Sequence, residues 1–252
     1  MWARHPLKHR FRTPVDVCIW DWRLRLMPRG NLSESRWLFL PRFVDRAERL
    51  FWQSHLAEDA VFLDIGANAG LYSFWVARCI SSAGRVVAVE PDPQLQRRMR
   101  FNLQQNHLVN IELIPAALGA TSGSARLVGD ANNLGQNRVS TAPTNRANAD
   151  DPALSKEVPV KTLLELCQQL GLARIDGLKI DIEGREHEVM AAFFATAPAA
   201  LFPKWLQFER CTEAQARDME RLVREVGYRR VALGRMNAIY QWDRPNQQEA
   251  TS

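Results

Sequence analysis

A carboxylate, a glycine-rich turn and a second carboxylate follow one another between residues 61 and 93. The apolar run 61–65 contains Asp64 and leads into Gly66–Gly70, whose sequence is Gly-Ala-Asn-Ala-Gly, and a helical pattern follows at once. Glu90 closes the next apolar run, about 20 residues past the last glycine, where a carboxylate can reach ribose hydroxyls. Glycine lets the backbone turn sharply and approach a ligand closely. The segment therefore predicts a site for a ligand that carries a ribose.

The glycine spacing distinguishes between ribose-bearing ligands. A dinucleotide site requires G-x-G-x-x-G, whereas this turn is G-x-x-x-G with Asn68 in its middle, and no lysine follows Gly70 as a P-loop requires. The form D-x-G-x-N-x-G with a downstream glutamate is closer to the pattern that binds S-adenosylmethionine (SAM). A turn with a purely structural role remains the alternative. The residues that we expect to bind the cofactor are Asp64, Gly66, Ala67, Asn68, Gly70, Glu90 and Pro91.

Two of these carboxylates have expected roles in cofactor binding. Asp64, near the end of its run, could balance the positive amino acid portion of SAM, either directly or through water. Glu90 could accept hydrogen bonds from both ribose hydroxyls, and such bonds are stronger than neutral ones because the acceptor is charged.

A second set of charged residues lies at the end of the apolar run 177–181. Lys179, Asp181 and Glu183 alternate with isoleucines, so in an extended chain all three point to one side. We hypothesise that Asp181 or Glu183 orients or deprotonates an acceptor hydroxyl. Lys179 would orient a carboxylate or stabilise a developing oxyanion. The alternative is an ion network that only fixes the loop.

Weaker candidates lie nearby. Glu209 ends another apolar run and could line the same cleft, or be an ordinary surface carboxylate. His187 lies four residues after Glu183 and could share a helix face with it, although a lone helical histidine more often faces solvent. The five histidines show no metal-ligand spacing. Asp181, Glu183 and Glu209 are the carboxylates that could hold a cation, but their spacing does not indicate a cation site, so we expect no metal.

The elements that must position these residues alternate between strand and helix. We expect strands at 61–65, 85–90, 111–114, 177–181 and 205–208, and helices at 71–80, 93–106, 162–170, 186–197 and 213–226. Residues 228–233 and 237–242 read as an antiparallel hairpin. The fold class is therefore α/β: a doubly wound, mostly parallel, seven-stranded Rossmann-like sheet with a terminal antiparallel hairpin, as in class I methyltransferases.

The remaining segments lie outside this alternation. We expect residues 1–58 to be an N-terminal extension with short strands at 15–20 and 22–27 and a helical pattern at 43–55. The methyltransferase domain would then span 59–243, and 244–252 would be a polar tail. Residues 116–118 and 124–128, joined by Ser122-Gly123, suggest a hairpin. Residues 129–157 have little apolar periodicity and suggest a long mobile loop.

Three motifs resemble those of the FkbM-type methyltransferases, many of which are O-methyltransferases. They are residues 62–73 (FLDIGANAGLYS), residues 89–93 (VEPDP) and residues 178–184 (LKIDIEG), with a weaker match at 115–119 (PAALG). The resemblance covers about residues 60 to 210. It implies SAM-dependent O-methylation of a hydroxyl on a small molecule or sugar. The chain departs from the family pattern at Leu164, where Asp is usual, and at Arg185, where Ala is frequent, and the second departure weakens any transfer of a particular substrate.

Composition and charge leave the acceptor open. The formal net charge is +5, and the first fifty residues are rich in arginine, which could meet nucleic acid, an anionic surface or simply solvent. The four cysteines are far apart and suggest neither a disulfide framework nor a zinc site. No secretory signal is evident, and no apolar run reaches the ~20 residues of a membrane span. We therefore expect a cytoplasmic protein.

Two other functions remain open. One is methylation of nucleic acid, which the basic N-terminal segment favours. The Asn/Asp-Pro-Pro-aromatic motif typical of base amino methylation is, however, missing where residues 179–184 stand. The other is a SAM-binding module that has lost catalysis. The sequence predicts neither the acceptor, the base among Asp181 and Glu183, the oligomeric state nor the role of residues 129–157.

Overall fold

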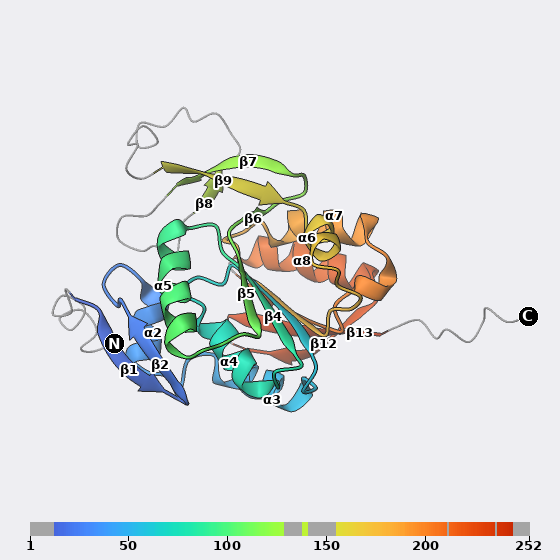
Figure 1. The fold of residues 1–252 in the computed structure, drawn as a ribbon. Coiled ribbons are helices and arrows are strands. Elements are labelled where there is room, and N and C mark those ends of the chain that lie inside the picture. Colours follow the sequence, from blue (N-terminus) through green and yellow to red (C-terminus); the bar gives the residue numbers. More distant parts are fainter. Residues whose placement is uncertain (1–12, 129–137, 141–154, 211, 235, 244–252) are drawn as a thin grey trace, which may run out of the picture.

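The centre of the molecule is a seven-stranded sheet. The structure is a computed structural model that describes residues 13–128, 138–140, 155–210, 212–234 and 236–243. The strand order is β12-β13-β11-β10-β3-β4-β5 (Figure 1). Strands β3, β4, β5, β10 and β11 are parallel, and β13 runs antiparallel to β11 and β12. The strands are β3 (Val61–Ile65), β4 (Arg85–Val89), β5 (Ile111–Ile114), β10 (Gly177–Ile180), β11 (Trp205–Glu209), β12 (Tyr228–Leu233) and β13 (Asn237–Trp242).

Helices connect the parallel strands, as the sequence predicts. Pro93 occupies the first turn of its helix, and the side chain of Asp92 caps it by accepting from the Gln94 amide at 2.6 Å. Thr162 and Glu165 form a reciprocal capping box at the start of another helix. The helices of the domain are α4 (Leu71–Cys79), α5 (Pro93–Gln105), α6 (Leu163–Gln169), α7 (Glu186–Thr196), the short 3₁₀ helix η2 (Ala199–Leu201) and α8 (Glu213–Glu225).

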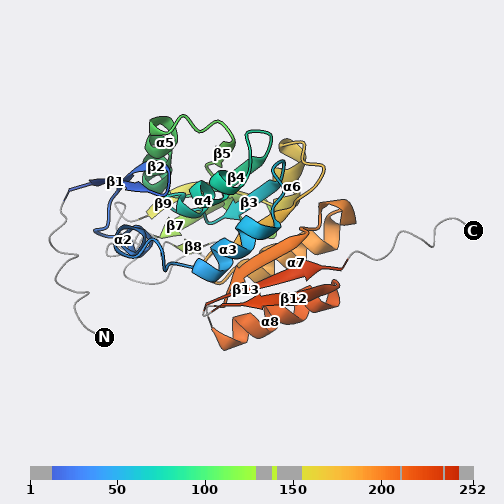
Figure 2. The same cartoon turned by 90° about the horizontal axis from the view of Figure 1, so that it is seen from below.

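The two faces of the sheet are covered by different helices (Figure 2). On one face, Leu63, Val87 and Leu178 pack with buried residues of α6, α7 and α8. On the other face, Phe62 and Val86 pack with α4 and with residues of the N-terminal extension. Both faces are covered, which explains why β3, β4 and β10 are nearly continuous apolar runs. The doubly wound α/β sheet with a terminal hairpin is confirmed.

The N-terminal extension shares the second of these cores. It consists of β1 (Val15–Ile19), β2 (Trp22–Leu26), α2 (Leu32–Phe39) and α3 (Arg46–His55). The indole nitrogen of Trp52 donates to the Gln207 side chain at 2.7 Å, and that of Trp22 donates to the Phe74 carbonyl at 2.9 Å. The described part of this extension is therefore packed into the same body as the sheet.

One expectation for the extension is wrong, and one of its helices was not predicted. The helix predicted from residue 43 begins at Arg46, because Asp45 adopts left-handed backbone angles that the α-helix excludes. Helix α2 was not predicted, since its eight residues give only a weak apolar period. Its start nonetheless has a local cause, because Asn31 caps it by accepting from the Glu34 amide at 3.1 Å.

The predicted hairpin of residues 116–118 and 124–128 is also wrong. β6 (Ala117–Leu118) and β7 (Gly123–Val128) do not pair with each other, because β9 (Ser155–Lys161) lies between them in a sheet of order β6-β9-β7-β8. Six residues of β7 pair with β9, with Val158 and Val160 buried, which β6 could not match with two residues.

The predicted loop 129–157 falls largely outside the described residues. Within it, Arg138–Ser140 form β8, which pairs with β7, and β9 already begins at Ser155. The proposed polar tail 244–252 lies wholly outside the described residues. Among the helices that are described, none is long and apolar enough to cross a membrane.

Candidate active site

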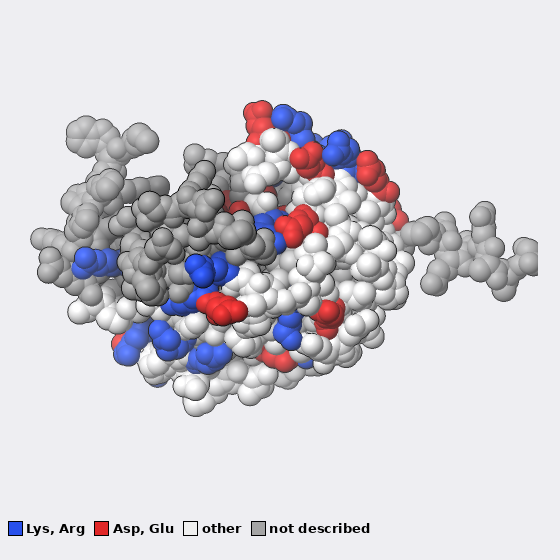
Figure 3. All heavy atoms as spheres, turned by 90° about the horizontal axis from the view of Figure 1, so that it is seen from above, with Lys and Arg blue, Asp and Glu red and all other residues white. Residues whose placement is uncertain are grey.

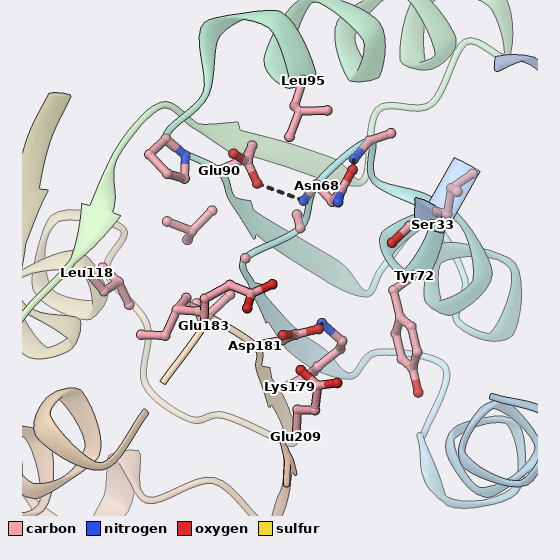
Figure 4. A pocket seen from close by; sticks show the side chains of 18 of the residues that line it. Ser33, Asn68, Tyr72, Glu90, Leu95, Leu118, Lys179, Asp181, Glu183 and Glu209 are labelled. Atoms are coloured by element: carbon pink, nitrogen blue, oxygen red, sulfur yellow. Dashed lines mark hydrogen bonds and ion pairs between the residues drawn. The ribbon is translucent and has the colours of Figure 1, made fainter. Parts of the chain in front are cut away.

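A pocket opens at the carboxyl ends of β3, β4 and β10 and encloses about 240 Å³ (Figure 4). From β3 the chain proceeds to β4 on one side, and later returns to place β10 on the other side. Ligands of doubly wound sheets bind at such a switch point. The pocket lies beside the Gly66–Gly70 turn and the segment after β10, so the fold brings together the two sets of residues that the sequence singled out.

The glycine turn is held by close backbone contacts. Gly66 and Asn68 have φ of +77° and +56°, and the amides of Gly66 and Ala67 donate to the Val89 carbonyl at 2.9 and 3.0 Å. A Cβ on Gly66 would lie 1.9 Å from the carbonyl oxygen of Asp181. The close approach that requires glycine here is therefore between this turn and the end of β10.

Gly70 serves helix packing. Its φ is +81°, and a Cβ would lie 2.7 Å from the sulfur of Met99 on α5. Gly70 is not among the residues that line the pocket, whereas Gly66, Ala67, Asn68, Glu90 and Pro91 are. The expectation that Gly70 binds the cofactor directly thus has a packing explanation beside it.

Glu90 is the buried carboxylate of one end of the pocket. Its two oxygens accept from the amides of Asn68 and Asp92, each at 2.8 Å, and the residue is 6% exposed (Figure 4). Burial raises the pKa of Glu90 to about 7, although these two amides oppose the shift. Each carboxylate oxygen has a second lone pair, so Glu90 can still accept hydrogen bonds from a ligand.

Apolar groups flank Glu90 and form what we call the nucleotide end of the pocket. They come from β4, from the start of α5 and from the segment that leads into β6. An apolar slot beside a carboxylate suits a flat heterocycle joined to a sugar with hydroxyl groups. The apolar lining residues are Val89, Pro91, Leu95, Ala116, Ala117 and Leu118.

Lys179 is held between two carboxylates. Its ammonium lies 3.6 Å from Asp64 and 3.3 Å from Asp181, and the residue is 7% exposed. Burial lowers the pKa of Lys179, but the charges of Asp181 and Asp64 outweigh it and raise this pKa well above its ordinary value. Lys179 and Asp181 line the pocket.

Asp64 lies behind this pair and does not line the pocket. It is fully buried, and one of its oxygens accepts from the Ser73 hydroxyl at 2.6 Å. Its other oxygen has no hydrogen bond in the structure and faces the Lys179 ammonium. The position of Asp64 favours a role in holding Lys179 over direct contact with a cofactor.

Glu183 does not continue the alternation that the sequence suggests. β10 ends at Ile180, and Glu183 has a φ of +57°, so Glu183 reaches the pocket from a turn and not from the strand (Figure 4). The turn is fixed by Glu186, a buried residue that accepts from the amides of Ile182 and Gly184 at 2.8 and 3.2 Å. Sequence reasoning missed Glu186, which is a buried acid in the first turn of α7.

The structure distinguishes between the two remaining candidates, Glu209 and His187. Glu209 at the end of β11 lines the pocket beside Lys179 and Asp181, whereas His187 is exposed on α7 and does not line it. Arg185, where the chain departs from the family pattern, lines the pocket and pairs with Glu188 at 2.7 Å. Within the described ranges, no group of three or more His, Cys, Asp or Glu side chains is arranged to hold a metal ion.

The N-terminal extension supplies pocket residues that sequence reasoning missed. They come from α2 and from the residue before α3, and together with Tyr72 of α4 they face the charged residues after β10. We call this part, with Lys179, Asp181 and Glu209, the acceptor end. The sequence held no signal for it, because the extension lacks a recognisable motif. The missed residues are Leu32, Ser33, Arg36, Trp37 and Asp45 of the extension, together with Tyr72 of α4 and Met236 between β12 and β13.

Known proteins share this sequence pattern. A family model described as the methyltransferase FkbM domain matches residues 64–230. The chain is 26% identical over 180 residues to the methyltransferase sdnD of Sordaria araneosa, which covers 62% of this chain and 68% of that protein. It is 30% identical over 193 residues to the AMB antimetabolite synthetase AmbE of Pseudomonas aeruginosa, covering 64% of this chain. The chain spans only 9% of that second protein's length.

A solved structure is also similar. The methyltransferase FkbM from Methylobacillus flagellatus KT superposes with a TM-score of 0.47 at 14% identity, over 74% of this chain and 44% of that chain. The family model covers more than half of the present chain, and its range includes the glycine turn, Glu90 and the Lys179–Glu183 segment.

Proposed function

The chain belongs to the FkbM methyltransferase family, and from this premise we propose that it transfers the methyl group of SAM to a hydroxyl of a small molecule or sugar. The observation that carries the proposal is the joining of two unlike ends in one pocket. Glu90 and apolar groups form one end, and Lys179, Asp181 and Glu209 form the other. The first suits a nucleoside, and the second suits a polar acceptor.

The residues of the nucleotide end fit the cofactor. The adenine would lie in the apolar slot beside Leu95 and Leu118, and the ribose hydroxyls would donate to Glu90. SAM, when bound, supplies a methyl group on a positively charged sulfur. The chain's own contribution is to align that methyl with the acceptor oxygen, and alignment alone lowers the barrier substantially.

The acceptor end would orient the hydroxyl and take up its proton. Asp181 is 3.3 Å from the Lys179 ammonium, which fixes its carboxylate while leaving lone pairs for the acceptor hydroxyl. Glu183 approaches from the turn that Glu186 holds, and is the second carboxylate that could accept the proton. Lys179 supplies positive charge where negative charge develops on the oxygen.

The first experiment is calorimetric titration of SAM and S-adenosylhomocysteine (SAH) into the purified protein. Wild type should bind both. Glu90→Gln should weaken SAH binding by about 1–3 kcal/mol, because one carboxylate oxygen becomes a donor and loses its partners. The matched control is Glu112→Gln on β5, whose exposed carboxylate pairs with Arg85 at 2.6 Å and lies outside the pocket. No binding by folded wild type, or equal losses in both variants, would contradict the assignment of the cofactor.

The second experiment tests the acceptor. A panel of hydroxylated small molecules and sugars would be incubated with SAM labelled in the methyl group. Label should appear in an ether linkage that survives mild acid and base. Methylation confined to nitrogen would contradict O-methylation. An absence of any product from a protein that binds SAM would favour a binding module.

One observation favours nucleic acid as a second candidate. Basic side chains gather on one side of the face seen in Figure 3. The elements β2 and α5 carry exposed arginines, and Arg25 and Arg97 line the same surface hollow. Binding to RNA or DNA that weakens steeply with salt would support this candidate. Salt-independent or absent binding would leave the small hydroxylated acceptor. The exposed arginines on these elements are Arg23, Arg25, Arg97 and Arg100.

A further inference from the structure

Asp45 begins α3 in an unusual way. Its backbone is left-handed, with φ and ψ of 42° each, and its side chain makes no capping hydrogen bond. Aspartate before a helix ordinarily has an extended backbone, and its carboxylate accepts from the amides of the first turn. Asn31, Asp92 and Thr162 cap their helices in that way. Asp45 thus adopts a strained conformation without the stabilisation that capping gives.

Asp45 lies at the acceptor end of the pocket. Asp45 lines the pocket together with Lys179 and Asp181. Burial raises the pKa of Asp45, the charges of Lys179 and Arg36 lower it, and the charge of Asp181 raises it again. Asp45 therefore lies close enough to Lys179 and Asp181 to feel their charges, although these two residues come from a distant part of the sequence.

Arg49 fixes the turn that carries Asp45. Its guanidinium donates to the carbonyls of Val44 and Pro41 at 2.8 and 2.9 Å. The same group lies over three indole rings, at 4.6 to 5.3 Å from their centroids. Arg49 is 4% exposed, so these contacts are shielded from water. The rings belong to Trp20, Trp37 and Trp75.

The strain at Asp45 and its rigid support have a common explanation. Strained backbone persists at functional sites when the surroundings fix it. We propose, on the basis of the methyltransferase function above, that Asp45 is an acceptor-binding residue whose carboxylate would lie near the transferred methyl when SAM is bound. It accepts a hydrogen bond from the acceptor, and Arg49 is the positioning residue that holds it there. The N-terminal extension thereby completes the site.

The test compares SAM with SAH, which lacks the methyl group and the positive charge on sulfur. Asp45→Asn removes the negative charge, keeps the side-chain size and tolerates left-handed backbone. It should lower SAM affinity roughly three- to tenfold, because a charge near the sulfonium is lost, and leave SAH affinity unchanged. The matched control is Asp59→Asn, whose exposed carboxylate pairs with Arg174 at 2.6 Å. Calorimetry should give this control the wild-type ratio of affinities.

Two further variants separate function from structure. Arg49→Lys keeps the charge but cannot donate to two carbonyls in a fixed fork, so it should also lower the preference for SAM while SAH still binds. Asp45→Gly relieves the backbone and should melt at the wild-type temperature or above it. A lower melting temperature with an unchanged preference for SAM would mean that Asp45 is only structural.

The outcomes distinguish this inference from the function on which it rests. If folded wild type binds neither SAM nor SAH, the methyltransferase proposal fails and Asp45 loses its role with it. If wild type binds both ligands, and Asp45→Asn keeps the wild-type ratio of SAM to SAH affinity, the inference about Asp45 alone is overturned.

Discussion

The nucleotide end of the pocket is built from backbone and apolar surface, whereas the acceptor end is built from charged side chains. At the nucleotide end, Gly66 and Asn68 take left-handed angles and Glu90 accepts from two amides of neighbouring turns. At the acceptor end, the Lys179 ammonium lies between the carboxylates of Asp64 and Asp181. The two ends therefore have different sensitivities: the first to shape, and the second to charge.

This difference has a consequence for how the site can change. At the nucleotide end, one methyl group added to a residue that lines the pocket would prevent close contact with a nucleoside. We therefore expect this end to permit few substitutions of its residues. The acceptor end permits changes of size as long as charges remain balanced, because unpaired buried charge is very costly. Substitutions that change charge at the acceptor end and substitutions that change shape at the nucleotide end should thus produce distinguishable losses of stability and of ligand affinity.

The largest effect is expected from Lys179→Met. Removal of the ammonium leaves the fully buried Asp64 without its ion pair, which should cost about 3–5 kcal/mol of unfolding free energy. Denaturant unfolding measures this loss. Lys204→Met, at an exposed lysine beside β11, is the matched control and should change stability little. Equal stability of the two variants would mean that the ion pair between Lys179 and Asp64 does not stabilise the folded protein.

Gly66→Ala should cost somewhat less, about 2–4 kcal/mol, because the new Cβ would displace the Asp181 carbonyl from its position 1.9 Å away. Gly171→Ala provides the control, since Gly171 also has positive φ (+61°) but no atom within 4 Å of the added carbon. That control should cost about 1 kcal/mol, the price of the left-handed backbone alone. Similar losses in both variants would argue that strain, and not contact between the turn and β10, makes Gly66 necessary.

The smallest effect is a pH dependence at the nucleotide end. Burial raises the pKa of Glu90 to about 7. If Glu90 binds the ribose hydroxyls as proposed, only its ionised form accepts fully from them. SAH affinity should therefore rise about tenfold between pH 6 and pH 8, as calorimetry at both values would measure. In Glu90→Gln, which has no carboxyl to ionise, affinity should not depend on pH in this range.

The same group gives a stability prediction of defined sign. The folded-state pKa of Glu90 is raised from 4.5 to about 7, so the folded protein binds the proton more tightly than the unfolded chain does. The resulting stability is present below pH 4.5 and is lost as the pH rises through 7. A stability that rises over this interval in wild type relative to Glu90→Gln would contradict the assignment.

The sequence indicated which turn and which carboxylate line the nucleotide end, because the determinants of both are local. The turn, its glycines and Glu90 lie within 27 residues, and each responds to the geometry of one strand end. The parallel strands were predicted for a related reason, since burial on both faces requires continuous apolar runs. Their predicted bounds agree with the structure to within a residue or two.

The acceptor end was predicted only in part, because it is assembled from distant segments. Lys179 and Asp181 followed from one motif, but the turn that redirects Glu183 has no sequence signal beyond Gly184. The place of Asp45 in the pocket could not be predicted, since nothing in the neighbouring sequence indicates a left-handed residue before a helix. The false hairpin at 116–128 has the same origin: the competing partner, β9, begins only at Ser155, 27 residues after Val128 ends β7.

The hydrogen bond between Trp52 and Gln207 has a consequence for the order in which the molecule assembles. The two residues are 155 positions apart, and a second link, from Asn237 to Glu48, joins residues 189 positions apart. During synthesis the extension therefore emerges long before the strands that anchor it. Contacts of such large sequence separation form slowly, because closing the long intervening loop costs entropy. The part of the N-terminal extension that contains Asp45 should accordingly be the last part of the pocket to reach its native position as the chain folds.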